Sequence, residues 1–221
     1  MALGLAGLAL SGLPVRAHRI GAGETRVFRA VNDLPDGLRA PAWVIMQAGN
    51  LAAVPAAAAL AVATGRQRLA VRLALAGAGT WALSKLVKRI YRRPRPPALV
   101  RGARSRGPEP SGLGFVSGHS GVALALAAAA WPQLGPAGRA AAAATVPVVG
   151  LARIYTGAHL PLDVAGGLAM GLATEAACEW LLDRSPTASV LATADRPAQL
   201  TAGRGRRRGR CSALRRLAEH R

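Results

Sequence analysis

Apolar residues in this chain form long blocks that are separated by short basic or proline-rich segments. A helix that spans a lipid bilayer needs about 20 largely apolar residues, and five blocks approach that length, the third and fourth being shorter than the others. They comprise residues 42–64, 70–87, 119–134, 140–155 and 162–182. Pro55 predicts a kink in the first block. The pattern predicts an all-α fold, in the form of an integral membrane helical bundle of five to six transmembrane helices.

The two ends of the chain depart from this pattern, so we divide the sequence into regions 1–23, 24–183 and 184–221. The first region begins with a short apolar segment that has neither the basic start nor the clear cleavage site of a signal peptide. We interpret it as a truncated first membrane helix, which would bring the number of spans from five to six. Residues 24–39 alternate charged and apolar positions, which is typical of an interfacial amphipathic helix.

The C-terminal region 184–221 ends in an arginine-rich tract of low complexity. This composition predicts disorder. A basic segment beside a membrane gains about 1 kcal/mol per Lys or Arg near anionic headgroups, so we expect the tail to bind anionic lipid. The net charge of +19 comes from loops and this tail and not from the apolar blocks. That distribution favours a membrane protein over a nucleic-acid binder, and we expect no nucleic-acid partner.

The distribution of basic residues among the loops predicts the orientation of the bundle. Alternating spans place the loop that begins at Arg66, the loop at Arg139 and the C-terminal tail on one side, which is cytoplasmic by the positive-inside tendency. The segments 88–116 and 156–161 then lie together on the extracytoplasmic side. Segment 88–116 is itself strongly basic, which opposes export, but the inner loops and tail together carry more basic residues. We therefore expect a multi-pass protein of the cell membrane.

Polar residues suited to phosphate chemistry occur in three short pieces at the ends of the apolar blocks. They are Lys88 with Arg95-Pro96, Ser117-Gly118-His119, and Arg153 with His159 and Asp163. An arginine can bind two phosphate oxygens at once, whereas a lysine acts as a point charge. Because Pro94 and Pro96 end any helix that begins before them, the two cations of the first piece can be directed at one place.

The second and third pieces add an anion-binding helix start and a histidine beside a carboxylate. Ser117 stands at a position suited to capping the next helix, where the amides of Gly118 and His119 are free to bind an anion. If a helix begins at His159, the i,i+4 spacing places Asp163 beside the imidazole. A carboxylate that accepts from one ring nitrogen fixes the tautomer and leaves the other nitrogen as a nucleophile.

The order and spacing Lys-x6-Arg-Pro, Ser-Gly-His and Arg-x5-His-x3-Asp resemble the signature of the type 2 phosphatidic acid phosphatase superfamily. This superfamily includes lipid phosphate phosphatases and vanadium haloperoxidases. The similarity covers region 24–183 and departs from the pattern at two places. Val116 stands where the family usually has proline, and Ala152 stands where it usually has serine.

The resemblance implies a role for each matching residue. His159 would attack phosphorus, Asp163 would orient His159, and His119 would protonate the leaving group. The phosphate would be held by Lys88, Arg95, Arg153, the Ser117 hydroxyl and the Gly118 amide. Water would then hydrolyse the phosphohistidine, and neither a metal nor a cofactor is implied. In family members with six helices this site lies at the extracytoplasmic helix ends, which agrees with the orientation predicted from loop charge.

We therefore expect a membrane lipid phosphatase that hydrolyses a phosphomonoester or diphosphate of a lipid, such as an isoprenoid diphosphate or phosphatidate. One alternative is a phosphotransferase of the same fold, and another is a vanadate-dependent haloperoxidase, against which the membrane spans weigh. A third is a weakly catalytic membrane protein whose basic tail binds an anionic partner. The intact His119, His159 and Asp163 argue against the third alternative, while Ala152 keeps it open.

Several other polar or small residues receive non-catalytic interpretations. We expect Arg89, Arg92 and Arg93 to form a solvated juxtamembrane cluster, and Arg104 and Arg106 to lie on a loop surface. The remaining expectations are close helix packing at Gly166, Gly167 and Gly171, pairing of Glu175 and Glu179 with arginine or water, and neither a disulfide nor a metal site at Cys178 and Cys211.

Overall fold

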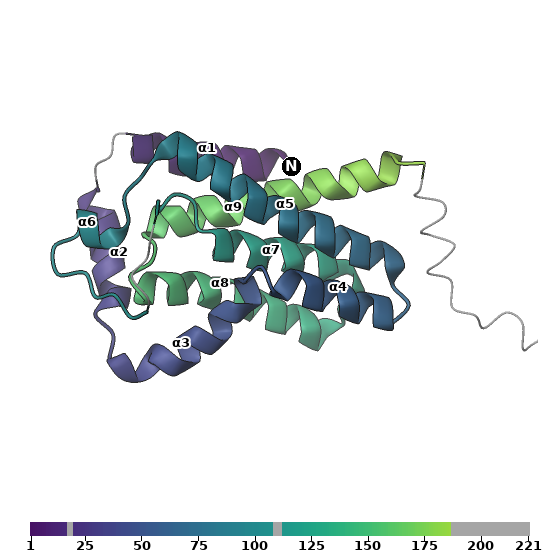
Figure 1. The fold of residues 1–221 in the computed structure, drawn as a ribbon, viewed down its shortest axis with the longest axis horizontal. Helices are drawn as coiled ribbons and strands as arrows, with labels where there is room; N and C mark the ends of the chain where they lie inside the picture. The colour runs from purple at the N-terminus through teal and green to yellow at the C-terminus, as the bar shows by residue number, and fades with distance from the viewer. Residues whose placement is uncertain (17–19, 108–111, 187–221) are drawn as a thin grey trace, which may run out of the picture.

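The computed structural model describes residues 1–16, 20–107 and 112–186, and these contain helices and no strand (Figure 1). The helices are α1 (Ala2–Arg16), α2 (Ala22–Asn32), α3 (Arg39–Met46), α4 (Ala53–Ala63), α5 (Gln67–Tyr91), α6 (Pro96–Leu99), α7 (Gly118–Ala130), α8 (Pro136–Tyr155) and α9 (Pro161–Arg184). Three short 3-10 turns lie at Asp36–Leu38, Gln47–Gly49 and Trp131–Gln133. The prediction of an all-α fold is confirmed. Most of the basic tail lies outside the described residues.

Helix α7 occupies the middle of the bundle, where it contacts α5, α8 and α9 (Figure 1). Its approach to α9 depends on glycines, because a Cβ at Gly121 would lie 2.9 Å from the carbonyl oxygen of Gly167. A Cβ at Gly171 would in turn overlap the carbonyl oxygen of Gly121. The close helix packing expected of Gly167 and Gly171 is therefore confirmed. An added Cβ at Gly166 would instead meet the ring of Phe115 at 2.7 Å, in the loop before α7.

The apolar block 42–64 folds as two helices instead of one kinked helix. Helices α3 and α4 are joined by the 3-10 turn Gln47–Gly49, and the two arms of this pair are bent by 61°. Inside a helix, a proline ring clashes with the carbonyl group four residues earlier. In the first turn of a helix, proline is tolerated. Pro55 therefore limits where α4 can begin, and the break lies before the proline and not at it.

The other four blocks correspond to single helices, α5, α7, α8 and α9. No single helix in the described part of the chain is both long and apolar enough to cross a bilayer by itself. The bent pair from Asp36–Gly49 and Ala53–Ala63 meets those requirements jointly, and Ala2–Val15 forms a shorter apolar helix. The number of membrane spans remains a prediction.

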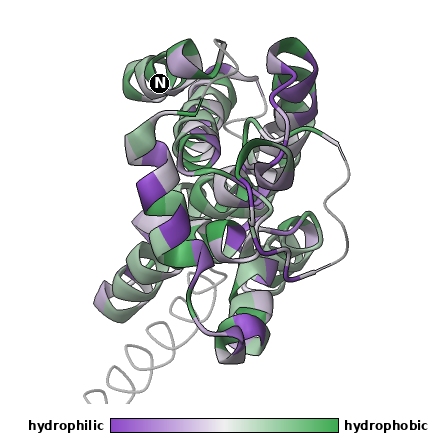
Figure 2. Cartoon of the chain, turned by 90° about the vertical axis from the view of Figure 1, so that its left-hand side faces the viewer, coloured by the Kyte–Doolittle hydropathy of each residue, from purple (hydrophilic) through white to green (hydrophobic). Residues whose placement is uncertain are grey.

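Helices α2 and α6 cover one end of the bundle, together with the loops that precede α7 and α9 (Figures 1 and 2). Phe28 of α2 is buried against Val100, Ile154 and Leu160. The segment that begins at Glu24 therefore packs its apolar face against protein, and its helix ends at Asn32, earlier than the interfacial helix 24–39 that we predicted.

Candidate active site

The three polar pieces come together at the end of the bundle that α2 and α6 cover. Lys88 lies in the last turn of α5 and Arg95 in the loop before α6, whereas Ser117 immediately precedes α7. Arg153 lies in the last turn of α8. The turn between α8 and α9 contains His159, and the first turn of α9 contains Asp163.

Hydrogen bonds join the three pieces pairwise. The ammonium of Lys88 donates to the carbonyl oxygen of Val116 at 2.6 Å, which joins the first piece to the second. The Ser117 amide donates to the carbonyl oxygen of Asp163 at 2.8 Å, which joins the second to the third. Arg95 Nη1 donates to the carbonyl oxygen of Ala158 at 2.8 Å and joins the first to the third. The structure thus brings all three predicted pieces into one site.

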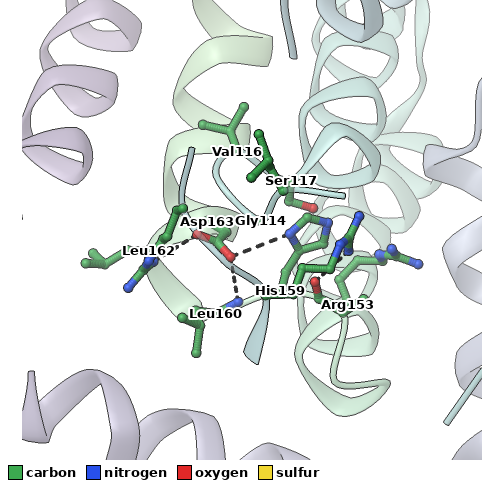
Figure 3. A network of polar contacts seen from close by, with 12 residues as sticks. Gly114, Val116, Ser117, Arg153, His159, Leu160, Leu162 and Asp163 are labelled. Carbon is green, nitrogen blue, oxygen red and sulfur yellow. Dashed lines mark hydrogen bonds and ion pairs between the residues drawn. The ribbon is translucent and has the colours of Figure 1, made fainter. Parts of the chain in front are cut away.

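The imidazole of His159 faces the carboxylate of Asp163 (Figure 3), with 3.6 Å between Nδ1 and Oδ2. His159 precedes the helix that we expected it to begin, because α9 begins at Pro161. Its backbone amide donates to the carbonyl oxygen of Arg153 at 3.2 Å, which ties this residue to the end of α8. The pairing expected from the i,i+4 spacing therefore occurs across a helix start instead of within a helix.

Burial keeps the His159 ring uncharged. The side chain is 3% exposed. Burial, together with the positive charges of Lys88 and Arg153, lowers the pKa of His159 well below the ordinary value of 6.5. A neutral imidazole retains a lone pair on one ring nitrogen while the other carries the proton. At neutral pH this histidine therefore has the protonation state that a nucleophile needs.

Ser117 caps the N-terminus of α7, as predicted. Its hydroxyl accepts from the backbone amide of Ser120 at 3.4 Å and lies 2.9 Å from the Ser120 hydroxyl. The helix begins at Gly118, so the first amides of α7 point toward the site. Figure 3 shows the Ser117 side chain beside the imidazole of His159. This helix start presents donors to an anion at the same place as the histidine.

Lys88 has a structural task in addition to the charge that it brings. Its ammonium donates to the carbonyl oxygens of Leu113, Gly114 and Val116 at 3.1, 2.9 and 2.6 Å. An ammonium has three protons, so these contacts use all of its donors. Lys88 therefore fixes the loop that leads into Ser117 and places a positive charge beside that loop.

The guanidinium of Arg153 makes few hydrogen bonds with the described protein groups. Its Nη1 lies 3.3 Å from the sulfur of Met46, which is a weak acceptor, and its buried Nε has no hydrogen-bond partner among the described residues. Figure 3 shows Arg153 beside His159. A buried arginine with unused donors is well suited to an anionic ligand.

Two arginines that we assigned to the surface are buried, and both interpretations were wrong. Arg93 is 1% exposed because it pairs with Glu24 and Asp163. Arg106 is 8% exposed and donates to the carbonyl oxygens of Asn32, Leu34 and Tyr155 and to Asp36.

The other surface and packing expectations are confirmed. The side chains of Arg89, Arg92 and Arg104 are exposed. Glu175 and Glu179 both pair with Arg72.

The two departures from the family pattern occupy buried positions. Val116 is fully buried and packs with Phe115 and Met170, so it fills space beside α9. Ala152 is 4% exposed. It lines an apolar groove between α3 and α8, on the helix turn that carries Arg153. Neither residue places a polar group in the site.

Comparisons with known proteins agree with this geometry. Residues 68–185 match the PAP2 superfamily. Decaprenylphosphoryl-5-phosphoribose phosphatase of Mycobacterium tuberculosis is 38% identical over 102 residues, which cover 44% of this chain. The matched part spans 54% of that relative, so the chain spans about half the length of the curated relatives it matches.

Two solved structures share the fold. LpxE of Aquifex aeolicus superposes with a TM-score of 0.65 at 22% identity, covering 70% of this chain and 93% of that one. A transmembrane PAP2 type phosphatidylglycerolphosphate phosphatase of Bacillus subtilis gives a TM-score of 0.62 at 22% identity, covering 82% and 96%. The match of residues 68–185 to the PAP2 superfamily confirms the sequence resemblance, and the chain belongs to that superfamily.

Proposed function

We propose that the protein is an integral membrane lipid phosphatase that cleaves a phosphomonoester or diphosphate through a phosphohistidine on His159. The observation that carries this proposal is the buried, neutral His159 between the Asp163 carboxylate and a group of cations. Phosphoryl transfer depends on a placed nucleophile and on positive charge around the phosphoryl oxygens. The site contains both the histidine nucleophile and the positive charges.

In the first step Nε2 of His159 attacks phosphorus, and the bond from phosphorus to the lipid oxygen breaks. Asp163 holds the proton on Nδ1 and stabilises the positive charge that develops on the ring. His119, in the first turn of α7, protonates the leaving oxygen. A bound phosphate beside His119 favours the protonated ring that this step requires.

Three cations and the start of α7 hold the phosphoryl group in this proposal. Arg153 and Arg95 donate to its oxygens, and Lys88 adds positive charge from the loop that it fixes. The Ser117 hydroxyl and the Gly118 amide supply neutral donors at the helix start. In the second step water attacks the phosphohistidine with His119 as general base, which releases phosphate and restores His159. No step requires a metal.

A lipid is the substrate class that best fits the surroundings of the site. An apolar groove of about 620 Å³ runs between α3 and α8, and its lining includes Ala152, the neighbour of Arg153. We assign the lipid tail to this groove and the phosphate to the polar site. The relatives are lipid phosphatases by name, and large apolar side chains such as Leu86, Ile90 and Leu181 are exposed on the outer helices. We infer a multi-pass cell-membrane protein of five to six spans, with an extracytoplasmic site and a lipid-binding basic tail.

The proposal is tested by phosphate release from lipid phosphates by the purified protein in detergent, with and without a chelator. The assay should include phosphatidate, an isoprenoid diphosphate and a phosphorylated polyprenyl sugar. We expect release from at least one of them at a rate that the chelator leaves unchanged, because cations of the chain replace a metal. Loss of activity with chelator would contradict the metal-free mechanism.

The same assay separates the alternatives. Transfer of the phosphoryl group to an added alcohol in preference to water would indicate a phosphotransferase. Absence of release from all substrates, in a preparation that still binds anionic vesicles, would favour a weakly catalytic membrane protein. Either result would overturn the proposed hydrolysis.

A further inference from the structure

A buried chain of charges reaches from α2 to the site. Arg93 Nη2 lies 2.6 Å from Glu24 Oε2, and Nη1 lies 3.0 Å from Glu24 Oε1 and 2.9 Å from Asp163 Oδ1. The side chains of Arg93, Glu24 and Asp163 are 1%, 6% and 0% exposed. One guanidinium therefore joins two carboxylates that are far apart in the sequence.

This chain of charges fixes the plane of the Asp163 carboxylate. Arg93 binds Oδ1, while the backbone amide of Leu160 donates to Oδ2 at 2.9 Å (Figure 3). With both oxygens held, the carboxylate cannot rotate, and Oδ2 keeps its place 3.6 Å from Nδ1 of His159. This distance is longer than a hydrogen bond, so Arg93 fixes the carboxylate that the His159 ring faces without a hydrogen bond between ring and carboxylate.

Glu24 in turn determines where Arg93 lies. Its two oxygens bind the two terminal nitrogens of the guanidinium, which is the bidentate geometry that arginine and carboxylate prefer. Glu24 Oε1 also accepts from the backbone amide of Leu162 at 3.1 Å, which ties it to the start of α9. Phe28 lies four residues later on the same face of α2 and is buried, so the helix that carries Glu24 is anchored.

We propose that Glu24 and Arg93 are positioning residues that hold Asp163, and through it His159, in the reactive orientation. This inference rests on the proposed function. Glu24 lies outside residues 68–185, the part of the chain that matches the family. Helix α2 therefore supplies a component of the active site that the matched segment does not contain.

The test is Glu24→Gln, with Glu175→Gln as its matched control. Glu175 is also 6% exposed and also pairs with an arginine, Arg72, but on the parts of α5 and α9 away from the site. A small misplacement of a catalytic group lowers the rate by up to about 100-fold. We expect Glu24→Gln to lower kcat about tenfold with little change in KM, and Glu175→Gln to leave both near the parent values. Equal kcat for the two variants would overturn the proposal.

A double-mutant cycle separates positioning from general structural support. Residues that act through one another lose their separate effects when combined. We expect Glu24→Gln to have no further effect on single-turnover rates when Asp163 is already replaced in Asp163→Asn. An equal loss in both backgrounds would show that Glu24 does not act through Asp163.

His159→Ala, assayed in parallel, distinguishes failure of this inference from failure of the proposed function. If His159→Ala keeps the activity of the parent, the phosphohistidine mechanism fails. If His159→Ala is inactive while Glu24→Gln matches the parent, only the positioning role fails.

Discussion

Replacement of His159 by alanine is expected to lower kcat for phosphate release by about 10⁴-fold or more, as loss of a catalytic nucleophile does in other enzymes. The imidazole of His159 lies 3.6 Å from the Asp163 carboxylate and is the nucleophile of the proposed mechanism. Because the cations to which we assign phosphate binding remain, KM for the lipid phosphate should change little. Initial rates at saturating substrate measure this effect.

Two controls accompany the His159 variant. His18→Ala removes a histidine that lies outside all three motifs, and it should keep the rate of the parent. Thermal unfolding of His159→Ala in the same detergent should show that the fold survives. A folded His159→Ala variant with more than a tenth of the parent rate would contradict the assignment of the nucleophile.

Replacement of Arg93 by alanine is expected to lower the free energy of unfolding by about 3–5 kcal/mol, the cost of removing one partner of a buried ion pair. The variant leaves Glu24 and Asp163 buried with no cation between them, since Arg93 binds both. Unfolding in mixed micelles, followed by circular dichroism, gives the difference in free energy.

Arg89→Ala is the matched control for Arg93→Ala. Arg89 lies four residues earlier and its side chain is exposed. A surface substitution of this kind usually changes stability by less than about 0.5 kcal/mol. Similar stabilities of the two variants would show that the buried ion pairs of Arg93 contribute little to folding.

The helices and most of the site were predictable because both are local in the sequence. Long apolar blocks separated by basic turns define α5, α7, α8 and α9. The Ser117 cap follows from a serine directly before an apolar block. The pairing of His159 with Asp163 follows from their spacing, even though the helix begins between them.

The buried charges were not predictable, because burial of an arginine depends on distant partners. Arg93 lies among other arginines in the sequence, and only the fold brings Glu24 to it from 69 residues away. Arg106 lies in a loop, and the sequence alone does not show that it is buried. Its guanidinium donates to carbonyl groups at the end of α8 and at the end of α2. The sequence Arg93-Pro94-Arg95 gave no signal that Arg93 pairs with two carboxylates while Arg95 donates to a backbone carbonyl.

The break between α3 and α4 was missed for a related reason. Composition marks residues 42–64 as one apolar block, and we placed its bend at Pro55 and gave no weight to Gly49. The turn instead includes Gly49, whose missing side chain allows it to lie against the backbone of His119. A glycine permits a close approach, but which segment packs against it depends on the fold.

The most direct test of the central claim is to stop the reaction with alkali during turnover of a lipid phosphate and to analyse the protein by mass spectrometry. The account predicts a phosphoryl group on the peptide that contains His159, stable in alkali and lost in acid, and its absence from the His159→Ala variant. A phosphoryl group on any other residue, or full turnover with no phosphorylated peptide at any time, would contradict the account.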